Sequence, residues 1–69
     1  SIDVLIEARK KAGLKQSELA ERLGKDQTFI SLIERYQRRL DVVEFYEYSI
    51  ALGEKPENLF IRLVEKFIT

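Results

Sequence analysis

Residues 16–35 read QSELAERLGKDQTFISLIER, and the spacing of apolar and turn residues in this stretch decides the fold. Its first part predicts a helix over residues 16–23, because three apolar side chains share one face: Leu19, Ala20 and Leu23. Gly24 is placed to adopt the left-handed conformation that ends a helix. Asp26 can cap a further helix that runs to about residue 35. Two helices joined by so short a turn predict a helix-turn-helix.

The second helix of this unit has an inner and an outer face. Ile30 and Ile33 are expected to point inward, and the small Ala20 lets another helix cross the first one closely. The outer face carries the other positions: Gln27, Thr28, Ser31, Leu32 and Arg35. Such a helix can enter the major groove of duplex DNA, which is about 12 Å wide.

The segments on either side also predict helices. Residues at spacings of three and four form a first helix that Gly13 ends: Ile2, Leu5, Ile6, Arg9 and Ala12. Asp41 can cap a fourth helix over residues 42–52, and Gly53 ends it.

Pro56 suits the first turn of a last helix that continues to about residue 67. No stretch alternates cleanly enough to be a strand. The expected fold is therefore all-α, a compact five-helix bundle in a single domain over residues 1–69.

The composition excludes several classes of function. The sequence contains no cysteine and no histidine, which removes thiol chemistry, the commonest general base and the commonest metal ligand. We therefore expect no enzyme, no metal, no cofactor and no small-molecule substrate. No apolar run reaches the ~20 residues needed to span a bilayer, and no signal-peptide pattern opens the chain, so we expect no membrane role.

Charge is unevenly distributed along the chain, although the formal net charge is zero. Residues 9–39 hold nine basic side chains against four acidic ones, a net charge of +5, and the flanks together carry −5. Such a segment can form the basic face that phosphate contact requires. The alternative is that these charges are scattered and only solubilise the chain.

One set of residues, spread over about residues 5–60, resembles the pattern of a known family. Its members here are Arg9, Ala12, Gly13, Leu14, Gln16, Glu18, Leu19, Ala20, Leu23, Gly24, Ile30, Ser31, Ile33, Glu34, Arg38, Arg39, Ala51, Leu52, Gly53 and Pro56. The family is the Cro/C1-type helix-turn-helix family of bacterial and phage regulators, also called lambda-repressor-like or XRE. The resemblance implies a five-helix bundle with residues 27–35 as the core of the recognition helix. It also implies a structural ion pair between Arg9 and Glu34 that ties the first helix to the third.

The resemblance assigns DNA-binding roles to polar side chains near this helix. Three are candidates for reading base edges: Gln27, Thr28 and Ser31. Gln16 and the start of its helix can contact phosphate, or Gln16 can instead bond to nearby backbone. Five basic side chains can add phosphate contacts without sequence preference: Lys15, Lys25, Arg35, Arg38 and Arg39. The alternative for each of these residues is an ordinary solvated surface position.

Two positions depart from what a DNA-reading helix would favour. Tyr36 stands where the family usually has glycine, and a tyrosine does not easily adopt a left-handed turn, so we expect the third helix to run longer than usual. Leu32 lies on the outward face, where a polar or basic side chain would suit a phosphate-rich groove better.

The fourth and fifth helices carry more apolar residues than one core-facing stripe needs. Four positions of the fourth helix can face the core: Val42, Phe45, Ser49 and Leu52. Three others form a second stripe: Val43, Tyr46 and Ile50. The fifth helix has a broad apolar face: Leu59, Phe60, Leu63, Val64, Phe67 and Ile68. Either a small domain uses all of these internally, or part of them, including Phe60, Val64 and Phe67, forms an interface.

Two functional hypotheses follow. The first is a sequence-specific regulator of transcription, such as a bacterial repressor, that binds double-stranded DNA in the cytoplasm as a homodimer; an antitoxin or a restriction-modification controller would use the same domain. The second is a protein-binding or self-assembling domain that keeps the fold but contacts a partner through Leu32, Tyr36, Val43, Tyr46 and Ile50. Binding to random-sequence DNA separates the two.

Overall fold

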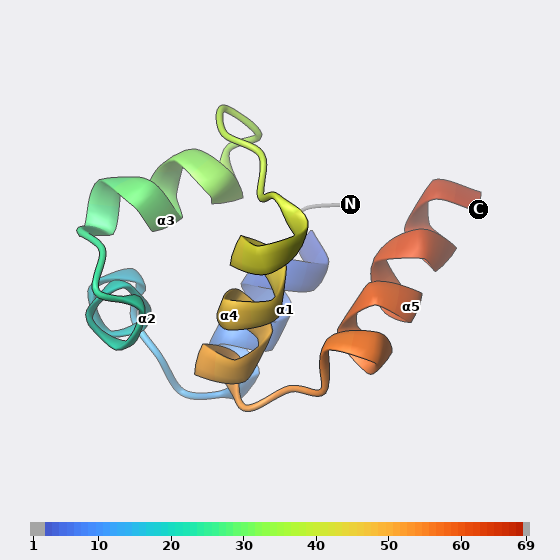
Figure 1. Ribbon diagram of the computed structural model, residues 1–69, viewed down its shortest axis with the longest axis horizontal. Helices are drawn as coiled ribbons and strands as arrows, with labels where there is room; N and C mark the ends of the chain where they lie inside the picture. The colour runs from blue at the N-terminus through green and yellow to red at the C-terminus, as the bar shows by residue number, and fades with distance from the viewer. Residues whose placement is uncertain (1–2, 69) are drawn as a thin grey trace.

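The computed structural model describes residues 3–68, which form five helices and no strand. The helices are α1 (Asp3–Lys11), α2 (Gln16–Leu23), α3 (Gln27–Glu34), α4 (Val42–Leu52) and α5 (Pro56–Ile68). In Figure 1, α2 and α3 lie together on one side, α1 and α4 occupy the middle, and α5 lies on the other side. This arrangement confirms the expected all-α, five-helix fold with a helix-turn-helix.

Local signals in the sequence set most helix ends. Asp26 Oδ1 accepts a hydrogen bond from the Phe29 N–H at 3.2 Å, and Asp41 Oδ1 accepts one from the Glu44 N–H at 2.7 Å. Each bond satisfies a donor that the first turn of a helix leaves unpaired. Gly24 follows α2 with a φ of 67°, in the left-handed region where a side chain costs energy. These helix ends were predicted correctly.

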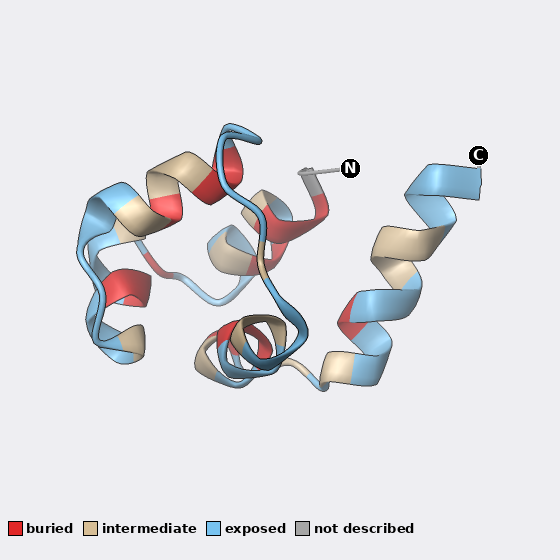
Figure 2. Ribbon diagram, turned by 45° about the horizontal axis from the view of Figure 1, so that its top comes forward, coloured by how far each residue is buried: buried red, intermediate tan, exposed pale blue. Residues whose placement is uncertain are grey.

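The core draws on all five helices (Figure 2). Its buried apolar members are Val4, Leu5, Ala8, Leu14, Leu19, Ala20, Ile30, Ile33, Tyr48, Leu52 and Leu59. Ile30 and Ile33 point inward as expected. The first helix forms as predicted, and its buried side chains are Val4, Leu5 and Ala8, while Ile6 is half-buried and Ala12 is exposed. Ile2 lies outside the described residues.

The inner face of α4 also differs from the expected one. Phe45, Ser49 and Leu52 are half-buried or buried as predicted, but Val42 is 82% exposed and Tyr48 is completely buried. Val42 is the first residue of the helix and lies beyond the edge of the core. Tyr48 follows Phe45 by three positions and precedes Leu52 by four, which places it on the face of the helix that they share.

Tyr36 does not extend α3, contrary to the expectation. The helix ends at Glu34, and Tyr36 adopts the left-handed conformation with a φ of 61°. Its N–H donates to the Ile33 carbonyl at 3.2 Å, and the Gln37 N–H donates to the Leu32 carbonyl at 2.8 Å. This pair of bonds is the Schellman motif that ordinarily uses glycine. The bonds offset the ~1–2 kcal/mol that a side chain costs in this conformation.

The Tyr48 hydroxyl generates a stability prediction. It is buried, and among the described residues it has no hydrogen-bond partner. Burial, reinforced by the charge of Glu34, raises the pKa of Tyr48 well above its ordinary value. Because a buried polar group without a partner costs free energy, Tyr48→Phe should leave the free energy of unfolding unchanged or raise it by up to ~1 kcal/mol.

Urea denaturation followed by circular dichroism measures this effect. Tyr48→Ala is the control for the ring itself and should cost ~3–5 kcal/mol through the cavity it leaves. A loss of more than about 1 kcal/mol for Tyr48→Phe would show that the hydroxyl stabilises the fold through a hydrogen bond.

Candidate nucleic-acid interface

The exposed side of α3 begins with its first two residues. Gln27 and Thr28 are exposed in the first turn, directly after the Asp26 cap, and Ser31 is half-buried one turn later. The unpaired N–H groups of a helix start, and the positive end of its dipole, favour approach to anionic groups. Gln27 and Thr28 therefore lie at the end of the helix that suits a nucleic acid, and Ser31 lies one turn further along.

A buried ion pair holds α3 against α1. Arg9 Nε donates to Glu34 Oε2 at 2.7 Å, and Arg9 Nη2 donates to Glu34 Oε1 at 3.1 Å. The side chains are only 11% and 4% exposed. The hydrogen bonds to Glu34 raise the pKa of Arg9 above its ordinary value. The ion pair that the family resemblance implied is thus present, and it is bidentate.

Gln16 links this pair to the surface. Its Nε2 donates to Glu34 Oε1 at 2.9 Å, and its Oε1 accepts from Gln27 Nε2 at 3.2 Å. A continuous set of side-chain hydrogen bonds therefore runs from the buried Glu34 to the exposed Gln27. The sequence did not reveal this role for Gln16, because residues 16, 27 and 34 come together only when α2 and α3 pack.

A second group of contacts gathers basic side chains around Phe29. The Arg38 guanidinium lies 4.7 Å and the Lys25 ammonium 5.4 Å from the centre of the Phe29 ring, both within the range of cation–π attraction. Arg38 also donates to both carboxylate oxygens of Glu44, at 2.9 and 2.7 Å. Phe29 and Glu44 were missed as partners of these cations. The position of Glu44, three residues after the Asp41 cap, indicates the capping box with Asp41 but not the contact with Arg38.

The other predicted phosphate contacts are exposed but not gathered in the same way. Lys15, Arg35 and Arg39 are all exposed. Arg35 Nε donates back to the Ser31 carbonyl at 3.2 Å, so this side chain lies along α3. The structure thus brings Gln16 into contact with Gln27 and places Lys25 and Arg38 around the Phe29 ring. The other three predicted cations, Lys15, Arg35 and Arg39, remain exposed at the surface.

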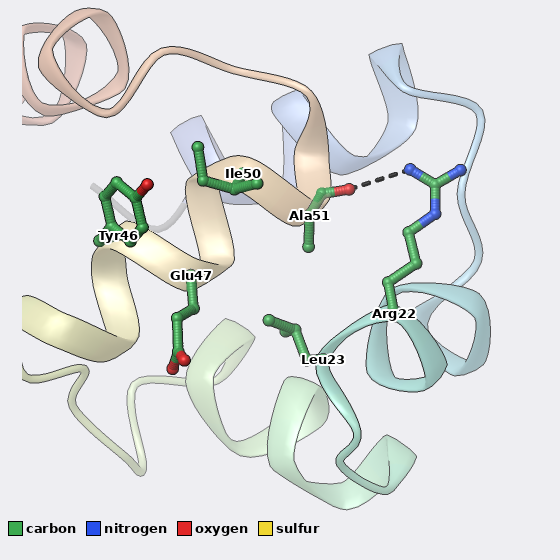
Figure 3. Close-up of a pocket in the computed structure, with 6 residues that line it drawn as sticks. All are labelled: Arg22, Leu23, Tyr46, Glu47, Ile50 and Ala51. Carbon is green, nitrogen blue, oxygen red and sulfur yellow. Dashed lines mark hydrogen bonds between the residues drawn. The ribbon is translucent and has the colours of Figure 1, made fainter.

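The apolar stripe on α4 is exposed, as expected. Val43, Tyr46 and Ile50 are 63%, 57% and 52% exposed. Beside this stripe, a groove of about 260 Å³ lies between α2 and α4, lined by Arg22, Leu23, Tyr46, Glu47, Ile50 and Ala51 (Figure 3). Arg22 Nη1 donates to the Ala51 carbonyl at 3.0 Å across one end of it.

Helix α5 exposes further apolar side chains. Four of them are more than half exposed: Phe60, Ile61, Phe67 and Ile68. Ile61 was not predicted as part of this face, and the predicted Val64 is half-buried. Leu32 is half-buried as well, so it presents less surface than the expected outward position implied. Tyr36 is exposed next to the end of α3.

Other kinds of site find no support within residues 3–68. No group of three His, Cys, Asp or Glu side chains is placed to hold a metal ion there. In the same part of the chain, no helix is both long and apolar enough to cross a bilayer.

Comparisons with known proteins agree with this geometry. A model of the helix-turn-helix family matches residues 5–59. The structure of an XRE-family like protein from Pseudomonas syringae pv. tomato str. DC3000 has a TM-score of 0.85 and 45% identity, covering 94% of this chain and 79% of that one. The restriction-modification controller protein C.AhdI from Aeromonas hydrophila has a TM-score of 0.77 and 33% identity, covering 84% of each chain.

A further controller protein, wild-type C.Esp1396I, has a TM-score of 0.86 and 26% identity, covering 99% of this chain and 90% of that one. A search of curated protein sequences finds no significant match. Together, fold and likeness define the class: the protein is a DNA-binding regulator of transcription, not an enzyme. More narrowly, the chain belongs to the XRE family of helix-turn-helix proteins.

The contact between Arg38 and Glu44 makes a prediction about pH. The hydrogen bonds from Arg38, with the backbone N–H of Asp41, lower the pKa of Glu44 from 4.5 to about 2. A lowered pKa in the folded state adds stability that is complete above the unfolded value and is lost as the pH falls through the folded one. Glu44 should therefore contribute to acid unfolding between about pH 4.5 and about pH 2.

Nuclear magnetic resonance titration of the Glu44 carboxyl tests this contribution. In Arg38→Gln the pKa of Glu44 should rise part of the way toward 4.5, because the bond from Asp41 remains. Arg35→Gln is the matched control, since Arg35 bonds to the Ser31 carbonyl and should leave that pKa unchanged. An unchanged pKa in Arg38→Gln would refute the assigned cause.

Proposed function

We propose that this protein is a sequence-specific regulator that docks α3 in the major groove of double-stranded DNA. Gln27, Thr28 and Ser31 read base edges in this proposal, because amide and hydroxyl groups supply the donors and acceptors that bases present there. One observation carries this proposal. The first turn of α3 is exposed, and the buried Arg9–Glu34 pair fixes the other end of the helix against α1. A base-reading helix needs this kind of rigid support.

Phosphate contacts supply affinity in the proposal. They come from the basic residues around α3: Lys15, Lys25, Arg35, Arg38 and Arg39, together with Gln16 at the start of α2. The net charge of +5 over residues 9–39 supports this assignment, since neutralised phosphates dominate non-specific binding to DNA.

The regulator acts as a homodimer in this proposal, joined through the α4 stripe of Val43, Tyr46 and Ile50. A two-fold interface must be complementary to itself. The groove beside the stripe supports this, because its lining combines apolar side chains with the cationic Arg22 and the anionic Glu47. In a two-fold pair, Arg22 of one copy can face Glu47 of the other.

The exposed apolar surface supports a second candidate, a domain that binds protein through Tyr36 and the α4 stripe without using DNA. The family membership and the controller relatives favour DNA binding over this candidate. Among DNA-binding roles, the same relatives favour a restriction-modification controller over an antitoxin. Such a bacterial regulator acts in the cytoplasm, where its DNA lies.

Substitution of the base-reading candidates tests sequence recognition. Gln27→Ala or Thr28→Ala should relax preference at one base position by ~1–3 kcal/mol, because each removes a donor or acceptor matched to a base edge. Sites selected from a pool of random duplexes supply the DNA, and competition titration measures the preference. Arg38→Ala should instead weaken binding to all sequences alike and lower the salt slope by about one. Equal losses on selected and random DNA for Gln27→Ala would remove that residue from base reading.

A charge in the α4 stripe tests the homodimer. Ile50→Glu should raise the dimer dissociation constant at least about thirtyfold, because it buries an unpaired carboxylate in the interface. Sedimentation equilibrium measures the constant. Ile61→Glu is the matched control, since Ile61 is similarly exposed, at 56%, but lies on α5 outside the stripe. If Ile50→Glu still dimerises and Ile61→Glu does not, the interface lies on α5 and the α4 stripe is excluded.

A further inference from the structure

We infer that Glu34 is a positioning residue for base recognition, because through Gln16 it determines which end of the Gln27 amide is held and which is offered to DNA. This inference rests on the proposed role of Gln27 in reading bases. Glu34 itself cannot touch DNA, since its side chain is only 4% exposed. The side-chain hydrogen bonds that lead from Glu34 to the exposed Gln27 run through Gln16.

The first step is the orientation of the Gln16 amide. Glu34 Oε1 accepts hydrogen bonds from Arg9 Nη2 and from Gln16 Nε2. A carboxylate that faces a guanidinium has acceptor oxygens and no proton to donate. Gln16 must therefore present its NH₂ group, because its carbonyl oxygen in that place would meet the carboxylate oxygen. Burial strengthens this preference, since electrostatic interactions are stronger at low dielectric.

The second step passes the orientation on to Gln27. With one N–H of its amide on Glu34, Gln16 turns its oxygen toward Gln27, and this oxygen accepts a hydrogen bond from Gln27 Nε2 at 3.2 Å. One N–H and the Oε1 of the exposed Gln27 amide remain for a ligand. Adenine offers the complementary pair in the major groove, the acceptor N7 and the donor N6–H₂. Because the Gln27 amide is held in one orientation, its free N–H and its Oε1 can meet N7 and N6–H₂ of adenine in only one arrangement.

Glu34→Gln tests the inference directly, because a glutamine at this position can donate as well as accept and no longer selects one orientation. Sites chosen from random duplexes first identify the base position at which Gln27→Ala loses preference, by roughly 5- to 150-fold. At that same position Glu34→Gln should lose about two- to tenfold, the worth of one net hydrogen bond, with other positions unchanged.

Arg9→Lys is the matched control for the ion pair. It removes the bidentate bonds to Glu34 and the bond from Arg9 Nη1 to the Leu14 carbonyl, but it keeps the charge and leaves the carboxylate as an acceptor. Its melting temperature should therefore fall, as that of Glu34→Gln should, while its base preference stays. Gln16→Ala leaves the buried pair in place, so it serves if Glu34→Gln fails to fold. Gln16→Ala should lose the same base preference as Glu34→Gln. The double variant that combines Gln16→Ala with Glu34→Gln should lose no more than either single variant.

A readout without DNA reports on the same contacts. In nitrogen-edited magnetic resonance spectra, the side-chain NH₂ protons of Gln16 should exchange slowly with water. In Glu34→Gln, the side-chain signals of both Gln16 and Gln27 should shift toward those of free glutamine. In Arg9→Lys, both should stay close to their original positions.

The outcomes separate this inference from the proposed function. If Glu34→Gln keeps the full base preference and leaves both glutamine signals in place, the inference is overturned. Base reading by Gln27 still stands in that case if Gln27→Ala loses preference at one base position. If Gln27→Ala affects no base position, base reading by Gln27 and the inference fall together. Loss of preference in Arg9→Lys equal to that in Glu34→Gln would also overturn the inference, because general loosening of α3 would then explain both.

Discussion

The buried pair of Arg9 and Glu34 is the interaction on which the other features depend. Burying either charge alone is costly, and removing one partner of such a pair typically destabilises a protein by ~3–5 kcal/mol. Here each partner is satisfied more than once, since Arg9 also donates to the Leu14 carbonyl and Glu34 also accepts from Gln16. The pair therefore sets the turn that follows α1, the start of α2 and the end of α3 at once.

The surface of the protein follows from this interior. Because α3 is held at its last residue by Glu34 and capped at its start by Asp26, its first turn is exposed in one defined orientation. The basic side chains around Phe29 lie beside this helix, and Glu44 holds one of them, Arg38, in place. The α4 stripe is a separate surface with an apolar character suited to a protein partner. DNA recognition and self-association thus have different surfaces in the proposed regulator.

Features set by neighbouring residues could be predicted from the sequence, and those set by packing could not. Asp26, Asp41 and Gly24 act within one turn of the backbone, so the helix boundaries that depend on them were predicted correctly. Tyr36 was misjudged because two backbone hydrogen bonds outweigh its residue preference. The contacts of Gln16 and Arg38 depend on how helices pack against one another, which periodicity does not encode.

In the proposed function, a dimer of this protein binds duplex DNA through α3 and through phosphate contacts from the basic residues around it. Titration of the purified protein against random-sequence duplex DNA at two salt concentrations, with molar mass measured alongside, tests it most directly. We expect binding at low salt that weakens steeply as the salt concentration rises, with two chains in each complex. A stable oligomer that binds no duplex even at low salt would contradict it.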